Sequence, residues 1–230
     1  MVCDMAALYD CSVPAELLTG MRLARGAIGR GELVVIPTDT VYGVAGDAFR
    51  PDAVERLLEA KGRGRQSPPP VLIPGIPTLE ALAETVTDEV RALAAEFWPG
   101  GLTIIVRARP TLEWDLGETR GTVALRMPSD KIALELLAET GPLAVSSANL
   151  TGEPAATTAS EAHRMLGDAV EVYLDGGPAG VGYPEAAERS GSTIVDATAL
   201  THPEGKLRIV RHGVIPDEQI VRIVGADRCA

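Results

Sequence analysis

The sequence predicts an α/β protein, with one twisted, mixed parallel and antiparallel sheet and helices packed on it. Helix-like and strand-like segments alternate through the first two-thirds of the 230 residues, and short strand-like segments dominate the last third. The composition is 46% apolar but only 3% aromatic, which indicates a core built mostly from Leu, Val, Ile and Ala. One α/β domain of this length can bury a large core.

The segment around which the rest is organised is residues 32–73. Residues 33–36 are a short apolar, β-branched run typical of a strand buried on both faces. They lead into a polar turn at residues 37–43, and the ends of strands are where α/β sheets bind ligands. Pro51 begins a helix with one apolar face. A cationic loop rich in glycine and proline follows at residues 61–70.

The remaining elements follow from apolar periodicity and from residues that start or stop helices. We expect a loose N-terminus at residues 1–11, a domain at 12–215 and a short C-terminal tail at 216–230, with a short helix at 216–224. Helices are predicted to begin near residues 12, 51, 78, 87, 130 and 158, the last with a capping box. Strands are predicted at 71–73, 102–106, 122–126, 143–146, 170–174 (half-exposed), 192–196 and 207–210.

Charge and cysteine content argue against several classes of protein. The formal net charge is −11, which disfavours an extended surface that tracks nucleic-acid phosphates. No stretch approaches the roughly 18 uninterrupted apolar residues of a membrane span. The N-terminus lacks the basic and then apolar organisation of a signal peptide. Cys3, Cys11 and Cys229 have no metal-ligand spacing, so we expect reduced thiols in a cytoplasmic protein.

Five short motifs occur in order along the chain. They are P-T-D-T-V-Y-G at 37–43, Lys61-x-Arg63, W-P-G-G-L-T at 98–103, V-A-L-R at 123–126 and Ser147-Ala148-Asn149. Together they resemble the YrdC/TsaC family of threonylcarbamoyl-AMP synthases, in its single-domain form. The resemblance implies a YrdC-like domain and an L-threonylcarbamoyladenylate synthase. Such a nucleotidyltransferase makes threonylcarbamoyl-AMP and pyrophosphate from L-threonine, bicarbonate and ATP, for tRNA threonylcarbamoyladenosine modification.

The implied reaction needs cations on a triphosphate, Mg²⁺, and donors that hold a carbamate in line with the α-phosphate. The sequence does not indicate the Mg²⁺ ligands. By resemblance, the catalytic residues are Lys61, Arg63, Ser147 and Asn149, and the threonine-binding residues are Thr40, Arg126 and Ser192. The implied ATP contacts are Lys61, Arg63, Ser67, Thr122, Ser147 and Arg211. The product would pass to a tRNA-modifying transferase, and neither tight RNA binding nor a membrane is expected.

Each of these residues also has an interpretation that needs no function. Taken alone, Lys61 and Arg63 are typical of a solvated basic loop, and Thr40 is typical of a hydroxyl that satisfies a turn. Ser147 is not expected to be a nucleophile, because the chain has no G-x-S-x-G elbow. The glycine-rich residues 175–182 fit no phosphate-binding pattern and predict a flexible turn.

The chain departs from the family pattern at two positions. Pro74 or Gly75 stands where the family often has a histidine that reaches threonine, and Ala155 replaces a serine that touches ATP. The alternative function is an RNA-binding or ribosome-assembly module of the same fold, against which the acidic total argues. A third candidate is the carbamoyl-transfer domain of hydrogenase maturation proteins, but the zinc-binding cysteine pairs of those chains are absent here.

Overall fold

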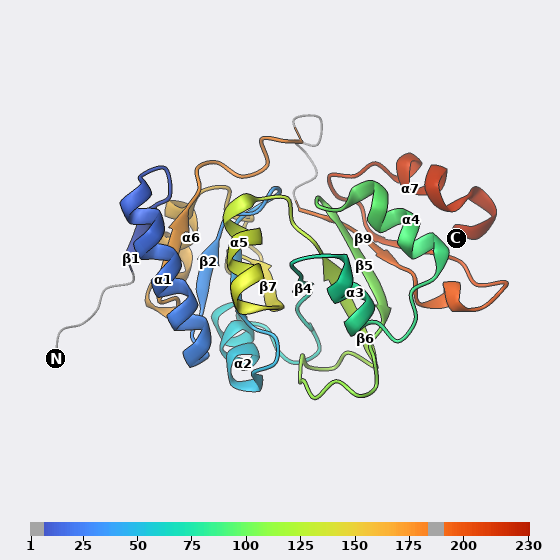
Figure 1. Cartoon of the computed structure of the whole chain (residues 1–230), viewed down its shortest axis with the longest axis horizontal. Coiled ribbons are helices and arrows are strands. Elements are labelled where there is room, and N and C mark those ends of the chain that lie inside the picture. The colour runs from blue at the N-terminus through green and yellow to red at the C-terminus, as the bar shows by residue number, and fades with distance from the viewer. Residues whose placement is uncertain (1–6, 184–190) are drawn as a thin grey trace.

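In the computed structural model, which describes residues 7–183 and 191–230, a mixed ten-stranded sheet crosses the molecule (Figure 1). The strands are β1 (Ala7–Asp10), β2 (Val34–Ile36), β3 (Gly43–Asp47), β4 (Val71–Leu72), β5 (Leu102–Arg107), β6 (Thr122–Arg126), β7 (Leu143–Ser147), β8 (Val172–Asp175), β9 (Thr193–Asp196) and β10 (Arg208–Arg211). Their order is β1-β8-β2-β3-β7-β4-β6-β5-β9-β10. Parallel pairs such as β2–β8 and β5–β9 occur beside antiparallel pairs such as β2–β3 and β5–β6, which confirms the predicted mixed sheet.

The helices begin largely where the sequence places a starting residue. They are α1 (Pro14–Arg30), α2 (Pro51–Ala60), α3 (Ile76–Leu82), α4 (Asp88–Phe97), α5 (Lys131–Thr140), α6 (Ala159–Leu166) and α7 (Asp217–Val224). The Thr87 hydroxyl accepts a hydrogen bond from the backbone N–H of Val90 and so caps α4. Thr158 and Glu161 complete the predicted capping box of α6. Helix α3 begins at Ile76, before the expected Thr78.

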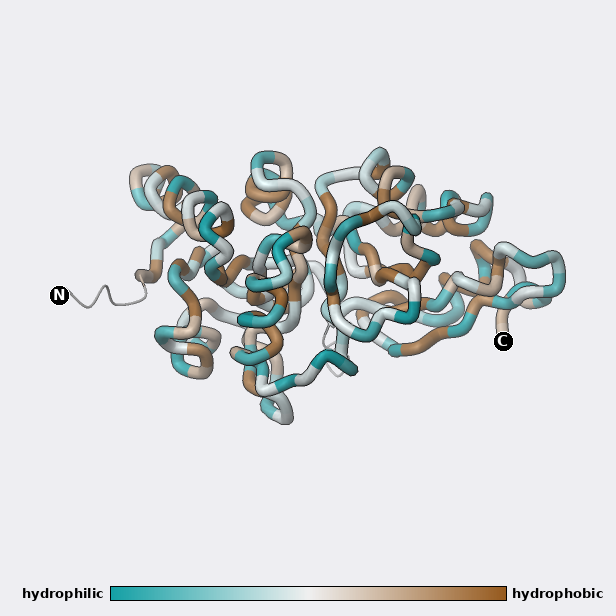
Figure 2. Tube along the Cα trace, turned by 90° about the horizontal axis from the view of Figure 1, so that it is seen from below, coloured by the Kyte–Doolittle hydropathy of each residue, from teal (hydrophilic) through white to brown (hydrophobic). Residues whose placement is uncertain are grey.

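Two hydrophobic clusters lie on opposite faces of the sheet. In β2, Val34 and Ile36 belong to the smaller cluster, and Val35 between them belongs to the larger one. Successive side chains of a strand point to opposite faces, so each cluster occupies one face. Helices α1 and α5 supply the smaller cluster, and α2, α3, α4, α6 and α7 supply the larger one. In Figure 2 the hydrophobic stretches gather on the inner strands and the hydrophilic ones on outer loops.

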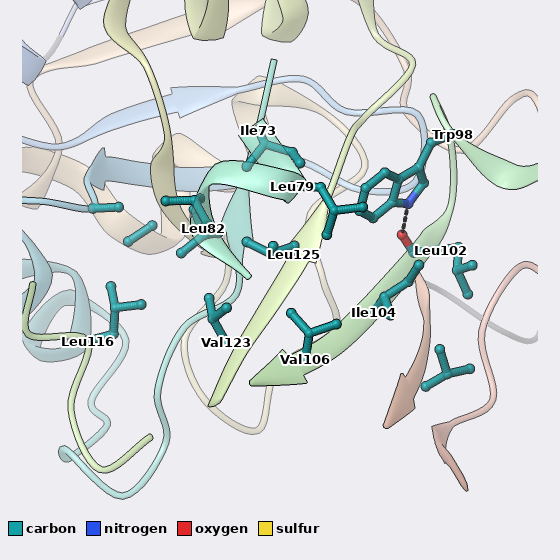
Figure 3. Packing of buried hydrophobic residues seen from close by; sticks show 14 of the residues in the cluster. Ile73, Leu79, Leu82, Trp98, Leu102, Ile104, Val106, Leu116, Val123 and Leu125 are labelled. Atoms are coloured by element: carbon teal, nitrogen blue, oxygen red, sulfur yellow. Dashed lines mark hydrogen bonds between the residues drawn. The ribbon is translucent and has the colours of Figure 1, made fainter. Parts of the chain in front are cut away.

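Figure 3 shows part of the larger cluster, where Leu79 and Leu82 of α3 lie over the strands that carry Leu125 and Val106. Trp98, at the end of α4, packs into the same cluster. Its indole N–H donates a 2.7 Å hydrogen bond to the carbonyl of Leu102 and closes the W-P-G-G turn (Figure 3). The turn is therefore fixed by a buried aromatic side chain at its first residue.

The predicted loose N-terminus, residues 1–11, is wrong for Ala7–Asp10, which form β1 and pair in parallel with β8. Residues 1–6, with Cys3, lie outside the described residues. The half-exposed strand expected at 170–174 is also wrong, because β8 lies between β1 and β2 and its residues Val172–Leu174 are buried. At the other end of the chain, the predicted helix is confirmed: α7 packs against α4.

Strand β3 forms an antiparallel hairpin with β2, and the sequence pattern did not predict it. Its sequence, GVAGD, contains two glycines, which weaken a strand pattern. The hairpin matters for the site because its connection is the P-T-D-T-V-Y turn. None of the helices in the described parts of the chain is long and apolar enough to cross a membrane.

Candidate active site

A cavity of about 490 Å³ lies on the face of the sheet that carries the smaller hydrophobic cluster. Leu72 of β4 and Val145 of β7 belong to that cluster and also line the cavity. Farther along the sheet, Thr103 lies between Leu102 and Ile104, which point into the larger cluster, so Thr103 points into the cavity. The cavity floor is therefore the part of this face that lies beyond α1 and α5.

The cavity collects most of the site residues that the sequence predicts. Seven of the ten line it: Thr40, Arg63, Arg126, Ser147, Asn149, Ser192 and Arg211. They come from the β2–β3 turn, the loop after α2, the ends of β6, β7 and β10, and the start of β9. Segments that are far apart in the chain thus meet around this one cavity.

Three predicted residues do not line the cavity. Thr122 is the first residue of β6 and Arg126 the last, which separates their Cα atoms by about 13 Å at the usual strand rise. The Thr122 hydroxyl donates instead to the carbonyl of Thr119. Ser67 lies just before Pro68 and Pro70, which do line the cavity. Lys61 lies behind the cavity wall.

The Lys61 side chain is fully buried and cross-links two motifs. Its ammonium group donates to the carbonyl of Ser147 at 2.5 Å, to the side-chain oxygen of Asn149 at 2.8 Å and to the carbonyl of Asn149. An ammonium group has three N–H donors, so these oxygens satisfy all of them. Burial and the nearby charge of Arg63 lower the pKa of Lys61 to about 8. Lys61 therefore supports the turn at 147–149 from beneath.

Asn149 is committed to the same turn. Its side-chain oxygen accepts from Lys61, and its amide nitrogen donates to the carbonyls of Leu150 and Glu153 at 3.0 and 2.6 Å. Both amide protons are therefore used within the protein. In contrast, the Ser147 hydroxyl faces the cavity and has no hydrogen-bond partner among the described residues. Of this pair, Ser147 is the residue with a donor available to a ligand.

Arg63 supplies an accessible charge. It is exposed, and among the described residues its guanidinium donates only to hydroxyls: Thr151 at 3.2 Å and Ser146 at 3.5 Å. Arg65, two residues later, is held away from the cavity by a 2.7 Å ion pair with Asp115. The glycine-spaced cations of this loop thus take different directions, and only Arg63 among them lines the cavity.

Arg126 is buried at the end of β6 and held on all three nitrogens. Its Nε donates to the carbonyl of Gly100 and its Nη1 to the Thr40 hydroxyl, both at 3.0 Å. Its Nη2 lies 2.8 Å from Oδ1 of Asp39 in an ion pair, but without the alignment of a hydrogen bond. Nη2 therefore keeps N–H groups that no described atom accepts.

The β2–β3 turn fixes the role of the Thr40 hydroxyl. The Thr38 hydroxyl donates its single proton to the carbonyl of Val41 at 2.6 Å. In its 3.2 Å contact with Thr40, Thr38 must therefore be the acceptor, which uses the Thr40 proton. Thr40 consequently offers a ligand a lone pair and no proton.

Arg211 and Ser192 form the opposite wall. The Arg211 guanidinium donates to the carbonyl and to the hydroxyl of Ser192, both at 2.9 Å, and that hydroxyl lies 2.7 Å from the Thr103 hydroxyl. Burial, and then the charges of Arg126 and Arg63, lower the pKa of Arg211. Three arginines thus act on one another across the cavity, and among the described residues Glu153 is the only acidic one that lines it.

Sequence reasoning missed Asp39 and Tyr183, which lie behind Arg126. Asp39 was part of the recognised P-T-D-T motif, but nothing in the sequence paired it with Arg126. Tyr183 follows the glycine-rich residues 175–182, and no pattern linked it to the site. The described residues contain no cluster of His, Cys, Asp and Glu that could hold a metal ion.

Comparison with known proteins gives one consistent family. The Sua5_yciO_yrdC family model, described as "Telomere recombination", matches residues 26–213. A Mycobacterium tuberculosis protein provisionally assigned as a threonylcarbamoyl-AMP synthase is 46% identical over 97% of each chain. The Bacillus subtilis threonylcarbamoyl-AMP synthase is 36% identical over 88% of this chain and 56% of its own length.

A solved structure agrees with these sequence matches. The crystal structure of Pyrococcus abyssi Sua5 complexed with L-threonine superposes with a TM-score of 0.79 at 35% identity. The match covers 91% of this chain and 58% of the Pyrococcus chain. The chain therefore spans a little over half of that protein and almost the whole of its mycobacterial relative.

Proposed function

The chain belongs to the Sua5/YciO/YrdC family, and from that premise we propose that it is an L-threonylcarbamoyladenylate synthase. The enzyme is a nucleotidyltransferase: it makes threonylcarbamoyl-AMP and pyrophosphate from L-threonine, bicarbonate and ATP. The observation that carries the proposal is a cavity of about 490 Å³ with three arginines in an otherwise acidic protein. Its volume lies within the usual range of small-molecule sites.

The reaction divides into a carbamate step and a phosphoryl step. The threonine amine attacks bicarbonate, water leaves, and a carbamate forms. A carbamate oxygen then attacks the α-phosphorus of ATP, and the bond from that phosphorus to the α,β-bridging oxygen breaks to release pyrophosphate. Little covalent help from the protein is needed, so positioning and charge stabilisation supply most of the catalysis.

The triphosphate is assigned to the side of the cavity that holds Arg63 and Ser147. Arg63 has a guanidinium free to fork onto phosphate oxygens, and the Ser147 hydroxyl is free to donate to them. Lys61 and Asn149 hold the turn that presents Ser147. Arg211, on the opposite wall, adds positive charge where negative charge develops.

Threonine is assigned to the side that holds Arg126. Arg126 lines the cavity, and its guanidinium suits a carboxylate. Thr40 can accept a hydrogen bond from the amine or hydroxyl of threonine, because its own proton is used by Thr38. Ser192 stands on the facing wall. This division leaves the amine between Arg126 and the triphosphate side, where the carbamate must form.

Magnesium enters this proposal as an ion carried mainly by ATP. Mg²⁺ commonly keeps several waters and binds through substrate phosphates with only one or two carboxylates. The cavity fits that mode, because the described part of its lining offers one carboxylate, Glu153, and several hydroxyls. When bound, the ion would neutralise phosphate charge.

The biological setting extends the proposal. Threonylcarbamoyl-AMP is an activated carbamate, so a transferase must consume it to modify tRNA, and we place both proteins in the cytoplasm. The RNA-binding alternative finds less support. An RNA surface needs many dispersed cations, whereas the arginines of this site face one cavity in a chain of net charge −11.

Pyrophosphate release tests the proposed reaction. We expect release from ATP with threonine and bicarbonate both present, and little release when either is omitted. Arg63→Ala should lower turnover by about 100-fold or more, since losing one such charge typically costs roughly 3–4 kcal/mol. Arg65→Ala is the matched control: it removes an arginine of the same loop that pairs with Asp115 outside the cavity. Release that does not depend on threonine would contradict the proposal.

A further inference from the structure

We propose that Tyr183 is a positioning residue that acts through Asp39 to orient Arg126 toward the carboxylate of the amino-acid substrate. The inference rests on the proposed function, because it assigns that carboxylate to Arg126. Neither Tyr183 nor Asp39 lines the cavity, so both act on the substrate only through the arginine.

Asp39 is buried against Arg126 and satisfied on both oxygens. Its side chain is 9% exposed, and that of Arg126 is 8% exposed. Oδ1 lies 2.8 Å from Nη2 of Arg126 and accepts a 2.9 Å hydrogen bond from the backbone N–H of Ser129. Oδ2 accepts a hydrogen bond from the Tyr183 hydroxyl at 3.2 Å. With its carboxylate plane fixed at both oxygens, Asp39 can hold the guanidinium in one orientation.

The Tyr183 hydroxyl links Asp39 to the W-P-G-G turn. It accepts a 2.9 Å hydrogen bond from the backbone N–H of Gly101 and donates its own proton to Asp39. The carbonyl of the neighbouring Gly100 accepts from Nε of Arg126. The hydroxyl therefore ties Asp39 to the turn that carries the Gly100 carbonyl, and both of these groups contact the Arg126 guanidinium. Burial, and then the charge of Asp39, raise the pKa of Tyr183, so the hydroxyl keeps its proton at neutral pH.

Residues 175–182, where the sequence predicts a flexible turn, are tied by hydrogen bonds to other segments of the chain. The Tyr42 hydroxyl donates to the carbonyl of Gly177 at 2.7 Å and accepts from the N–H of Gly176 at 3.0 Å. The N–H of Ala179 donates to the carbonyl of Thr157. A side chain at position 101 would come within 3.1 Å of the Tyr183 hydroxyl and 2.3 Å of Val214, so glycine is required for this approach.

The contacts of Arg126 explain how Asp39 and Tyr183 affect the substrate. Gly100 and Thr40 each take one N–H, and Asp39 lies beside Nη2 without an aligned bond. The guanidinium is thus oriented by protein acceptors, and Arg126 lines the cavity although its Nη2 atom is buried. Losing the Tyr183 hydroxyl would free Oδ2 of Asp39, and the resulting shift of the ion pair would turn the guanidinium away from the substrate carboxylate.

The test compares wild-type protein with Tyr183→Phe, which removes one oxygen and keeps the ring. We expect the KM for threonine, and its dissociation constant by calorimetry, to rise about 3- to 10-fold, the scale of one lost hydrogen bond. The kcat and the KM for ATP should change little. Tyr173→Phe is the matched control, because the Tyr173 hydroxyl is also bonded inside the protein, to the carbonyl of Gly167, but away from the cavity.

L-Threonine amide separates positioning of Arg126 from general loosening, because its carboxamide carries no charge. Tyr183→Phe should reduce discrimination between threonine and the amide, since only the threonine carboxylate depends on Arg126. An equal loss for both ligands, or a variant that matches wild type, would overturn the inference. Wild-type protein that binds threonine without releasing pyrophosphate would contradict the proposed function alone, and the binding comparison would still decide the role of Tyr183. Wild-type protein that binds no threonine would overturn both.

Discussion

At the residue scale, Lys61 shows how a motif lysine can be buried by contacts that the sequence does not reveal. The sequence predicts a cation at this position for the triphosphate, and in the structure its ammonium group lies against the turn at 147–149. What the sequence does not contain is the direction of the side chain. That direction is set by three oxygens of residues 147–149, a segment far away in the chain. Asp39 and Tyr183 were missed for the same reason, because tertiary contacts alone bring them to Arg126.

The first prediction concerns Lys61→Met. We expect pyrophosphate release to fall by about 100-fold or more, because the buried oxygens of the turn lose their donor and Ser147 moves. If Lys61 acts through Asn149, the double variant with Asn149→Ala should be no worse than Lys61→Met alone, which a double-mutant cycle measures. Arg63→Ala and Asn149→Ala should combine more nearly additively. Additive losses in the Lys61 cycle would contradict a supporting role.

The second prediction is a loss of activity near pH 8. Below its pKa of about 8, the Lys61 side chain is a protonated ammonium group that holds the turn at 147–149. This charge is lost as the pH rises through that value. In the unfolded chain the pKa returns to the ordinary 10.5, so between these values the unfolded state binds more protons. The contribution of this group to the free energy of unfolding therefore increases with pH. Activity should therefore fall as the pH rises through about 8, whereas the contribution of Lys61 to the free energy of unfolding should not fall.

The measurement is a profile of kcat/KM for ATP against pH, with a thermal melt at each pH. Arg63→Gln removes one of the two causes of the lowered pKa, so its alkaline limb should move to higher pH. Lys61→Arg keeps its charge throughout and should lose the limb near pH 8. A limb that stays in place in both variants would mean that another group titrates.

At the element scale, the sequence predicts best where a local rule decides the outcome. Thr87 and Thr158 start helices because their hydroxyls cap free N–H groups, and Thr122–Arg126 is a strand with the predicted bounds. Strands β1 and β3 were missed because neither has a strong local pattern. Strand β1 is four residues long and is stabilised by pairing with β8, and β3 is held between β2 and β7. Their partners lie elsewhere in the chain, so local periodicity could not reveal them.

The third prediction tests the packing of α1 on β1 and β8. A methyl group at Gly20 would lie 2.8 Å from Leu174 and 2.9 Å from Cβ of Tyr9, so Gly20→Ala should destabilise the fold by about 1–3 kcal/mol. Gly29 lies in the same helix with nothing within 4 Å, so Gly29→Ala should stabilise it by up to about 1 kcal/mol. Urea unfolding of the two variants measures both changes. A neutral Gly20→Ala would contradict the position of β1.

At the scale of the whole molecule, a net charge of −11 surrounds one cavity lined by Arg63, Arg126 and Arg211. Long-range repulsion opposes the approach of any polyanion, whereas a small anion inside the cavity meets mainly the nearby cations. Screening by salt weakens interactions at a distance more than contacts in a partly buried site. This charge distribution therefore favours the binding of small anions over that of long polyanions.

The fourth prediction follows from that charge distribution. Labelled ATP should bind with a shallow dependence on salt, and labelled tRNA should bind weakly at physiological ionic strength. Each phosphate neutralised by the protein would steepen the fall of RNA affinity by close to one log unit per log unit of salt. Titrations of both ligands between about 50 and 200 mM salt make the comparison. Tight tRNA binding with a steep slope would favour the RNA-binding alternative.

The position of β8 between β1 and β2 has a consequence for how the chain folds during synthesis. The ribosome makes β1 and β2 early, but the strand that joins them ends at Asp175. Until then, β1 lacks its partner and β2 presents an open edge, which is a template for pairing with another chain. Pairings between distant segments also slow folding. The cavity needs Ser192 and Arg211 as well, so a nascent chain completes this cavity only after all ten strands of the sheet have been made.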